Sequence, residues 1–265
     1  MASGLAFPIE RCIVGIMNEN TQTTESIPDA ARWLDQLSDQ DALGVMVEDQ
    51  AQAATSVRAA LPQIEEASKA VLARLNASST GRIIYAGAGT SIRIGVQDGV
   101  ELTPTFDWPE SRAAYLIAGG SQALLRSVEN AEDNAEDARK QVMENEIGPD
   151  DVLIGVAASG TTPFTCAAVE AARDQGALTI GIANNPSSQL VAVAEYGITL
   201  HTGAESVAGS TRLKAGTAQK ICLNLISTLV MVRLGRVRHG MMSAMRASNA
   251  KLRARQLRID AALKS

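Results

Sequence analysis

The sequence predicts an α/β fold, a three-layer sandwich in which a parallel sheet lies between two layers of helices. The first observation is a unit that occurs twice, over residues 82–91 and 151–163: an apolar run, a loop of small residues and a helical stretch. Such units pack as parallel strands covered by helices, with ligands at the carboxyl ends of the strands. The second is composition: 265 residues, 46% hydrophobic and 20% charged, are enough to bury such a core.

The N-terminal part predicts an arm followed by a helical extension. Residues 1–27 show no regular pattern, and we expect residues 1–39 to form an arm ahead of one α/β domain over residues 40–265. Apolar residues then recur near 3.6-residue spacing up to about Leu75, which indicates helical structure. Pro62 interrupts this stretch, so we expect two helices there.

The helical spacing of apolar residues ends before residue 82. The apolar run 82–85 enters the glycine-rich segment 86–91, as a buried strand enters a tight loop. The run 151–157 leads in the same way into a second loop, where Thr162 suits a helix N-cap and Pro163 the first helical position. The expected elements that follow are a helix to about Gln175, strands over 178–182 and 197–201, and a long C-terminal helix from Ser210 or Thr211 to about Leu234.

Composition excludes several functions. A net charge of −5 with 3% aromatic residues argues against a nucleic-acid surface and against base-stacking platforms. The three cysteines are widely spaced and odd in number, which fits neither a disulfide framework nor a zinc site. No signal peptide pattern is present, and the apolar segment 221–234 is too short and too polar to span a bilayer. We therefore expect a cytoplasmic protein without metal or membrane partner.

The two loops between strand and helix predict an anion site. Small residues let backbone N–H groups approach a phosphate, hydroxyls add donors, and the next helix contributes its positive end. Neither loop is a nucleotide motif, because Ile92 replaces a required glycine in the first and the second lacks Gly-Lys-Ser/Thr. Two well-capped helices are the alternative. The candidate phosphate-binding residues are Gly89, Thr90, Ser91, Ser159, Gly160, Thr161 and Thr162.

Acid–base chemistry is expected from carboxylates, because the only two histidines, His201 and His239, lie where structural roles are commoner. Glu101 has apolar neighbours and follows the first loop, which makes it a candidate proton donor. An exposed acid at a helix end is an equal alternative. Glu132 belongs to an acidic run, and local sequence alone favours a solvated helix face there.

Longer strings resemble one family. Residues 86–91, followed by Arg93, Gly95, Asp98 and Glu101, look like the catalytic-acid signature of N-acetylmuramic acid 6-phosphate etherases. Residues 116–133 resemble the segment with the second glutamate of that family, and Glu132 lies 31 residues after Glu101, the family's separation. Residues 157–163 and 209–220 continue the match, and Asn249 with residues 251–253 extends it. The similarity covers roughly residues 24–260.

The resemblance implies a sugar isomerase (SIS) type domain, a homodimer and a cofactor-free elimination on a sugar phosphate. In it, Glu132 abstracts the C2 proton and Glu101 protonates the departing lactate oxygen. Ser91, Ser159 and Thr162 are implied to line the phosphate and sugar site. Glu205, Ser210 and Lys214 are weaker implied candidates on a later loop.

Some positions depart from the family pattern. Ile92 replaces a glycine, Thr161 replaces an arginine, and residues 238–241 differ. The chain also ends soon after Leu252, so we expect the family's small C-terminal helical domain to be absent. These departures leave a phosphosugar aldose–ketose isomerase and a non-catalytic sugar-phosphate sensor as alternatives.

Overall fold

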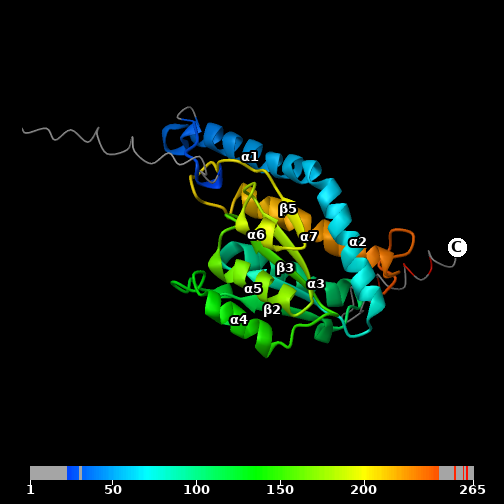
Figure 1. The fold of residues 1–265 in the computed structure, drawn as a ribbon. Coiled ribbons are helices and arrows are strands. Elements are labelled where there is room, and N and C mark those ends of the chain that lie inside the picture. Colours follow the sequence, from blue (N-terminus) through cyan, green and yellow to red (C-terminus); the bar gives the residue numbers. More distant parts are fainter. Residues whose placement is uncertain (1–22, 30–31, 245–253, 255–258, 260, 262–265) are drawn as a thin grey trace, which may run out of the picture.

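The computed structural model describes residues 23–29 and 32–244, together with positions 254, 259 and 261. Its centre is a five-stranded sheet in the order β2-β1-β3-β4-β5, in which every neighbouring pair is parallel (Figure 1). The strands are β1 (Ile83–Gly87), β2 (Ala113–Ile117), β3 (Val152–Ala157), β4 (Leu178–Ala183) and β5 (Tyr196–Thr199).

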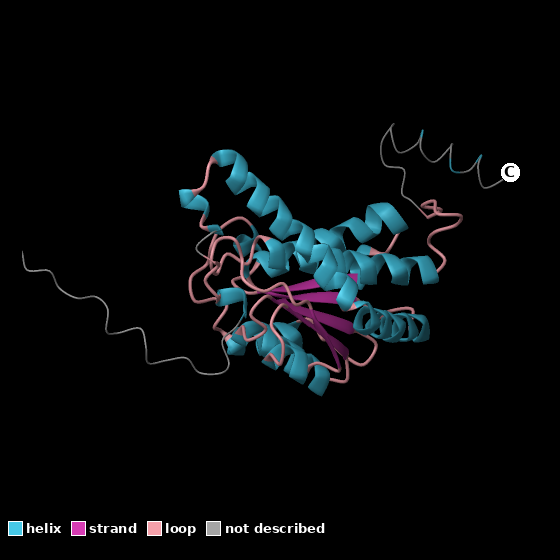
Figure 2. Cartoon of the chain, turned by 90° about the horizontal axis from the view of Figure 1, so that it is seen from above, coloured by secondary structure: helices cyan, strands magenta, loops and turns pink. Residues whose placement is uncertain are grey.

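Helices cover both faces of the sheet, so the predicted three-layer α/β architecture is confirmed. The helices are α1 (Asp39–Ala59), α2 (Leu61–Ala77), α3 (Gly89–Phe106), α4 (Ala135–Glu144), α5 (Pro163–Asp174), α6 (Gln189–Val193) and α7 (Lys214–Arg233). Figure 2 shows helices on both sides of the sheet. Helices α2, α3 and α7 belong to one face and α4, α5 and α6 to the other, while α1 packs on α7.

Side chains alternate between two apolar clusters, one on each face of the sheet. On β1, Ile83 and Tyr85 belong to the cluster with α2, α3 and α7, whereas Ile84 belongs to the cluster with α4, α5 and α6. Every residue of β1, β3 and β4 is buried. Strands covered on both faces are expected to be continuously apolar, which explains the runs in the sequence.

The helical extension divides as predicted. Helix α1 ends at Ala59, and α2 begins at Leu61 with Pro62 in its first turn. Proline fits there because the first N–H groups of a helix have no intrahelical partner. Ser38 caps α1 by accepting a hydrogen bond from the Asp41 N–H at 3.2 Å.

Helix α7 starts at Lys214 with Leu213 as its N-cap. The expectation that the helix begins at Ser210 or Thr211 was therefore wrong. The helix has 20 residues, more than the 221–234 segment considered above, and by length and composition it could cross a membrane. However, 56% of its apolar window is buried, and it packs against α1, α2 and α3. This is the pattern of a core helix.

Strand β2 and helices α4 and α6 were absent from the elements expected from the sequence. Strand β2 lies at the edge of the sheet, and Ala113, Ala114 and Tyr115 are only half-buried. Helix α6 has five residues, too few to show a helical period.

Cys166 and Cys222 are buried free thiols, as expected for inert cysteines. Burial, followed by the nearby charge of Glu170, raises the pKa of Cys166 to about 11. Burial raises the pKa of Cys222 as well. Three features used in the prediction, namely Cys12, Asn249 and residues 251–253, lie outside the described residues.

Candidate functional site

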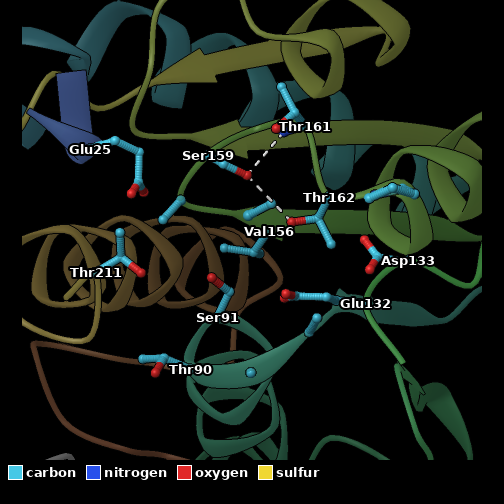
Figure 3. Close-up of a pocket in the computed structure, with 15 residues that line it drawn as sticks. Glu25, Thr90, Ser91, Glu132, Asp133, Val156, Ser159, Thr161, Thr162 and Thr211 are labelled. Atoms are coloured by element: carbon cyan, nitrogen blue, oxygen red, sulfur yellow. Dashed lines mark hydrogen bonds between the residues drawn. The ribbon is translucent and has the colours of Figure 1, made fainter. Parts of the chain in front are cut away.

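The topology creates a crevice between the carboxyl ends of β1 and β3. From β1 the chain continues into α3 on one face of the sheet, and from β3 into α5 on the other. Neighbouring strands whose connections leave toward opposite faces form a switch point, where α/β sheets bind ligands. A pocket of about 390 Å³ lies at this point (Figure 3). Its lining side chains come from both loops, from residues 132–133, and from Glu25 and Thr211.

The first loop wraps tightly around the end of β1. A Cβ on Gly87 would lie 2.8 Å from the Val156 carbonyl oxygen, so only glycine fits there. Gly89 has φ of +53°, a conformation that glycine adopts without strain. Ala88 is the N-cap of α3 and provides no side-chain hydrogen bond. The first turn of α3, with Thr90 and Ser91, therefore presents backbone N–H groups without a side-chain cap to the pocket.

The second loop places hydroxyl groups beside the start of α5. Gly160 has φ of +70°, and a Cβ there would lie 2.3 Å from the Ser188 hydroxyl oxygen. Ser159 Oγ accepts a hydrogen bond from the Thr161 N–H at 3.2 Å and lies 3.4 Å from Thr162 Oγ1 (Figure 3). Thr162 is the N-cap of α5 and Pro163 occupies the first turn, as predicted, but the Thr162 side chain does not cap the helix. The start of α5 therefore has no side-chain cap, like the start of α3.

Glu132 lies beside both loops. Its carbonyl oxygen accepts a hydrogen bond from the Phe164 N–H at 2.9 Å, which fixes the loop after β2 to the first turn of α5. Figure 3 shows its carboxylate pointing toward Ser91, with Asp133 next to it. Within the described part of the chain, no group donates a hydrogen bond to the Glu132 carboxylate. An exposed, unpaired carboxylate at this position is available to take a proton from a ligand.

The N-terminal arm adds a residue that sequence reasoning missed. Glu25 lines the pocket on the side of Thr211 (Figure 3). The buried Asn185, which follows β4, holds the arm: its Oδ1 accepts from the Thr24 N–H at 3.2 Å, and its Nδ2 donates to Thr24 Oγ1 at 2.9 Å. The same Nδ2 lies 3.3 Å from the carbonyl oxygen of Ser159. Irregular local sequence gives no signal for this contact, since it joins residues 161 positions apart.

Glu101 does not line this pocket. It is exposed on α3, ten residues after Ser91, which corresponds to about 15 Å along the helix. Its neighbour Val100 is 51% exposed. Within one subunit, therefore, the two glutamates are not brought together.

Glu205 and Lys214 are buried at the start of α7, outside the pocket lining. The Glu205 carboxylate accepts hydrogen bonds from the N–H groups of Lys214, at 3.0 Å, and of Ala215, at 2.8 Å, and so caps α7. Burial raises the pKa of Glu205, against the effect of these two bonds. Lys214 Nζ donates to the Ala204 carbonyl at 2.7 Å. Ser210 and Gly160 also lie outside the lining, whereas the other predicted loop residues contribute to it.

A second pocket of about 220 Å³ adjoins the first. The two share Ala88, Gly89 and Glu132. The second pocket includes two arginines, Arg93 and Arg126, whereas the charged residues lining the first are all acidic. Among the described residues, no group of three or more His, Cys, Asp or Glu could hold a metal ion.

Known proteins agree with this architecture. The family model of the glucokinase regulatory protein N-terminal SIS domain matches residues 63–173. A phosphoheptose isomerase from Francisella tularensis has a similar structure, with a TM-score of 0.54 and 20% identity over 76% of this chain and 100% of that one. Phosphoheptose isomerase GmhA from Neisseria gonorrhoeae gives a TM-score of 0.52 and 18% identity, again over 76% and 100%.

Closer relatives come from bacteria. An N-acetylmuramic acid 6-phosphate etherase of Deinococcus radiodurans is 48% identical over 243 residues, which cover 92% of this chain and 79% of the relative. The etherase of Streptomyces coelicolor is 47% identical over 91% of this chain and 77% of the relative.

The parallel sheet, its strand order and the pocket at its switch point define a SIS-type α/β domain. Within this class the sequence identities are decisive. The chain belongs to the N-acetylmuramic acid 6-phosphate etherase family.

Proposed function

We propose that the chain is a cofactor-independent carbon–oxygen lyase that cleaves the D-lactyl ether of N-acetylmuramic acid 6-phosphate. The products are N-acetylglucosamine 6-phosphate and D-lactate. Family membership supports this activity. The observation that carries it is the free Glu132 carboxylate facing two hydroxyl-lined helix starts. We further propose that the enzyme works in the cytoplasm.

The phosphate binds where α3 and α5 begin. Backbone N–H groups of the first turn of α3 and the hydroxyls of Ser91, Ser159 and Thr162 supply donors, and the dipoles of both helices favour an anion. No lysine or arginine is needed for this, and none lines this pocket in the described structure. The bound phosphate fixes the sugar so that its C2 and C3 lie toward Glu132.

Elimination then needs one base and one acid. In the open-chain sugar the C2 proton is acidic because C1 is an aldehyde. Glu132 takes this proton, the C3–O bond breaks, and a carboxylic acid donates a proton to the departing lactate oxygen. The double bond between C2 and C3 then adds water: hydroxyl to C3 and a proton to C2. Glu101 is the acid implied by the family.

Because Glu101 is remote from the pocket of its own subunit, we propose that it acts in the pocket of a second copy. A homodimer that buries Val100 of α3 and Leu225 of α7 fits this arrangement, since both are exposed large hydrophobic residues on neighbouring helices. In a twofold symmetric dimer, each subunit would contribute its own Glu101 to the pocket of the other subunit.

Lactate release tests the activity itself. We expect purified protein to release D-lactate from N-acetylmuramic acid 6-phosphate without added metal or cofactor. Ketose formation from glucosamine 6-phosphate without lactate release would instead indicate an aldose–ketose isomerase. Tight binding of sugar phosphates without turnover would indicate a sensor.

Mixed dimers test the shared site. Glu101→Gln and Glu132→Gln should each be inactive alone. If the glutamates of one site come from two subunits, half of randomly mixed dimers hold one complete site, which restores about a quarter of wild-type activity. If both come from one subunit, the mixture stays inactive.

Solvent exchange tests the two roles. In deuterated water, Glu101→Gln should still exchange the C2 proton while failing to release lactate, because the base is intact. If Glu132→Gln exchanged the C2 proton and Glu101→Gln did not, the roles of base and acid would be reversed.

A further inference from the structure

We propose that Arg126, in the pocket adjoining the phosphate site, binds the carboxylate of the group that leaves the sugar. This inference rests on the proposed function, because it assigns a subsite to the lactyl group. The conclusion comes from the distribution of charge around Glu132.

The proposed substrate has two anionic groups, a phosphate at C6 and a carboxylate on the ether substituent of C3. They cannot share the first pocket favourably. Its donors are uncharged, and its charged lining residues, Glu25, Glu132 and Asp133, are all acidic. Thr161 adds no positive charge. A second anion there would meet like charges at short range, which is unfavourable.

The second pocket differs in charge and lies on the correct side. Glu132 lines both pockets, so a sugar whose C2 faces Glu132 extends its C3 substituent across this shared border. The volume of about 220 Å³ suits a group of a few atoms. A guanidinium matches a carboxylate with two parallel hydrogen bonds.

Of the two arginines that line the second pocket, Arg126 has the guanidinium that is free to bind a ligand. Both arginines line the pocket, but Arg93 is engaged: its Nε donates to the Leu124 carbonyl at 3.1 Å and its Nη2 to the Ala123 carbonyl at 2.9 Å. No described residue accepts a hydrogen bond from the Arg126 side chain. Arg93 therefore holds the loop just ahead of Arg126, and Arg126 remains available for a ligand.

Two acidic residues, Glu129 and Glu132, also line this pocket. Arg93 and Arg126 balance these two negative charges, whereas no basic residue balances the acidic residues that line the first pocket. A bound carboxylate would pair with Arg126 and be repelled by Glu129, which favours a fixed orientation of the leaving group.

The experiment compares two ethers of the same sugar phosphate: the natural lactyl ether and a neutral analogue with a carboxamide in place of the carboxylate. For each enzyme we measure kcat/KM for release of the side group. Arg126→Gln should lower the preference for the acid over the amide by roughly 10- to 100-fold, the value of one charge-assisted hydrogen-bonded pair. Arg126→Lys should keep part of the preference.

Arg58→Gln is the matched control, because Arg58 is exposed on α1 and lines neither pocket. It should change the preference by no more than about twofold. An equal loss on both ethers, or no loss, with Arg126→Gln would overturn the subsite. If the wild-type protein releases no lactate, the proposed function fails instead. Calorimetric binding of the same two ethers then decides on Arg126, because binding requires no turnover.

Discussion

The two ends of the sheet differ in how their polar groups are paired. At the amino end, just before β1 and β3, Arg82 and Asp151 form a salt bridge of 2.7 Å. Asp151 also accepts from the backbone N–H groups of Arg82 and Gly148. Arg112 donates to the Gly81 and Ser78 carbonyls and lies 4.2 Å above the Trp108 ring. At the carboxyl end, no side chain caps α3 or α5, and no described group donates a hydrogen bond to the Glu132 carboxylate.

This contrast separates stability from function within one sheet. Paired groups at the amino end lower the free energy of the folded state. Unpaired donors and acceptors at the carboxyl end contribute little to folding but are ready for a ligand. Substitutions at the two ends should therefore change different observables, and each prediction below tests that separation.

The largest expected effect is on turnover. Glu132→Gln keeps the size of the side chain but removes the base, so lactate release should fall by roughly 10²- to 10⁴-fold. The melting temperature should stay near wild type, because the carboxylate has no hydrogen-bond donor to lose. Thermal unfolding and a lactate assay on the same preparation check both statements, and Glu136→Gln serves as the control because Glu136 is exposed and lines neither pocket. A strongly destabilised Glu132→Gln protein would break the contrast.

The next effect is on stability. Asp151→Ala leaves Arg82 and two backbone N–H groups without their acceptor, which should reduce the free energy of unfolding by roughly 2–4 kcal/mol. Urea unfolding measures it, with exposed Asp150→Asn as the control. The kcat of the folded variant should match wild type. A loss of kcat without a loss of stability would show that the amino end also affects the site.

The stability difference should depend on pH. Burial raises the pKa of Asp151, but hydrogen bonds from Arg82 and Gly148 outweigh it, so the net pKa lies below its ordinary value of 3.8. An acid with a lowered folded pKa stabilises the protein fully above its unfolded pKa and loses that contribution as the pH falls through the folded value. The gap between wild type and Asp151→Ala should therefore be constant from neutral pH to about pH 5 and shrink below about pH 4. A gap that widens on acidification would contradict the assignment.

The smallest effect is on substrate affinity. Ser159→Ala removes one hydroxyl donor to the phosphate, while backbone donors remain. KM should rise by roughly 10-fold with a smaller change in kcat. Ser121→Ala, in the turn after β2, is a matched control because it lines neither pocket. An unchanged KM would place the phosphate elsewhere.

Most of the fold could be predicted from the sequence because the central strands are buried on both faces. Apolar runs such as 151–157, followed by small residues, have few other interpretations. Strand β2 gave no such signal, since an edge strand is covered less completely. The start of α7 was also missed: its cap is Glu205, nine residues before Lys214, and no local capping rule covers that distance.

The candidate site was predictable in part. Each of the loops after β1 and β3 is one continuous segment of the sequence, so the hydroxyl residues within each loop could be recognised as a group. Glu25 could not, because a buried amide at residue 185 brings the arm to the pocket. For Glu101 the local sequence left a proton donor and an exposed acid as equal alternatives, and the structure shows it exposed, because the exposed side of α3 depends on how the helix packs. The shared catalytic role of Glu101 and Glu132 stays a prediction.

Asn185 has a consequence for observing the enzyme at work. The Asn185 side chain accepts a hydrogen bond from the Thr24 N–H and donates one to the Ser159 carbonyl oxygen. Opening of the N-terminal arm should therefore be coupled to opening of the loop after β3. Hydrogen exchange at the Thr24 amide should then be slow despite its position in a three-residue 3₁₀ helix, Thr23–Glu25. It should slow further when a sugar phosphate orders the Ser159 loop, which makes this amide a label-free reporter of occupancy.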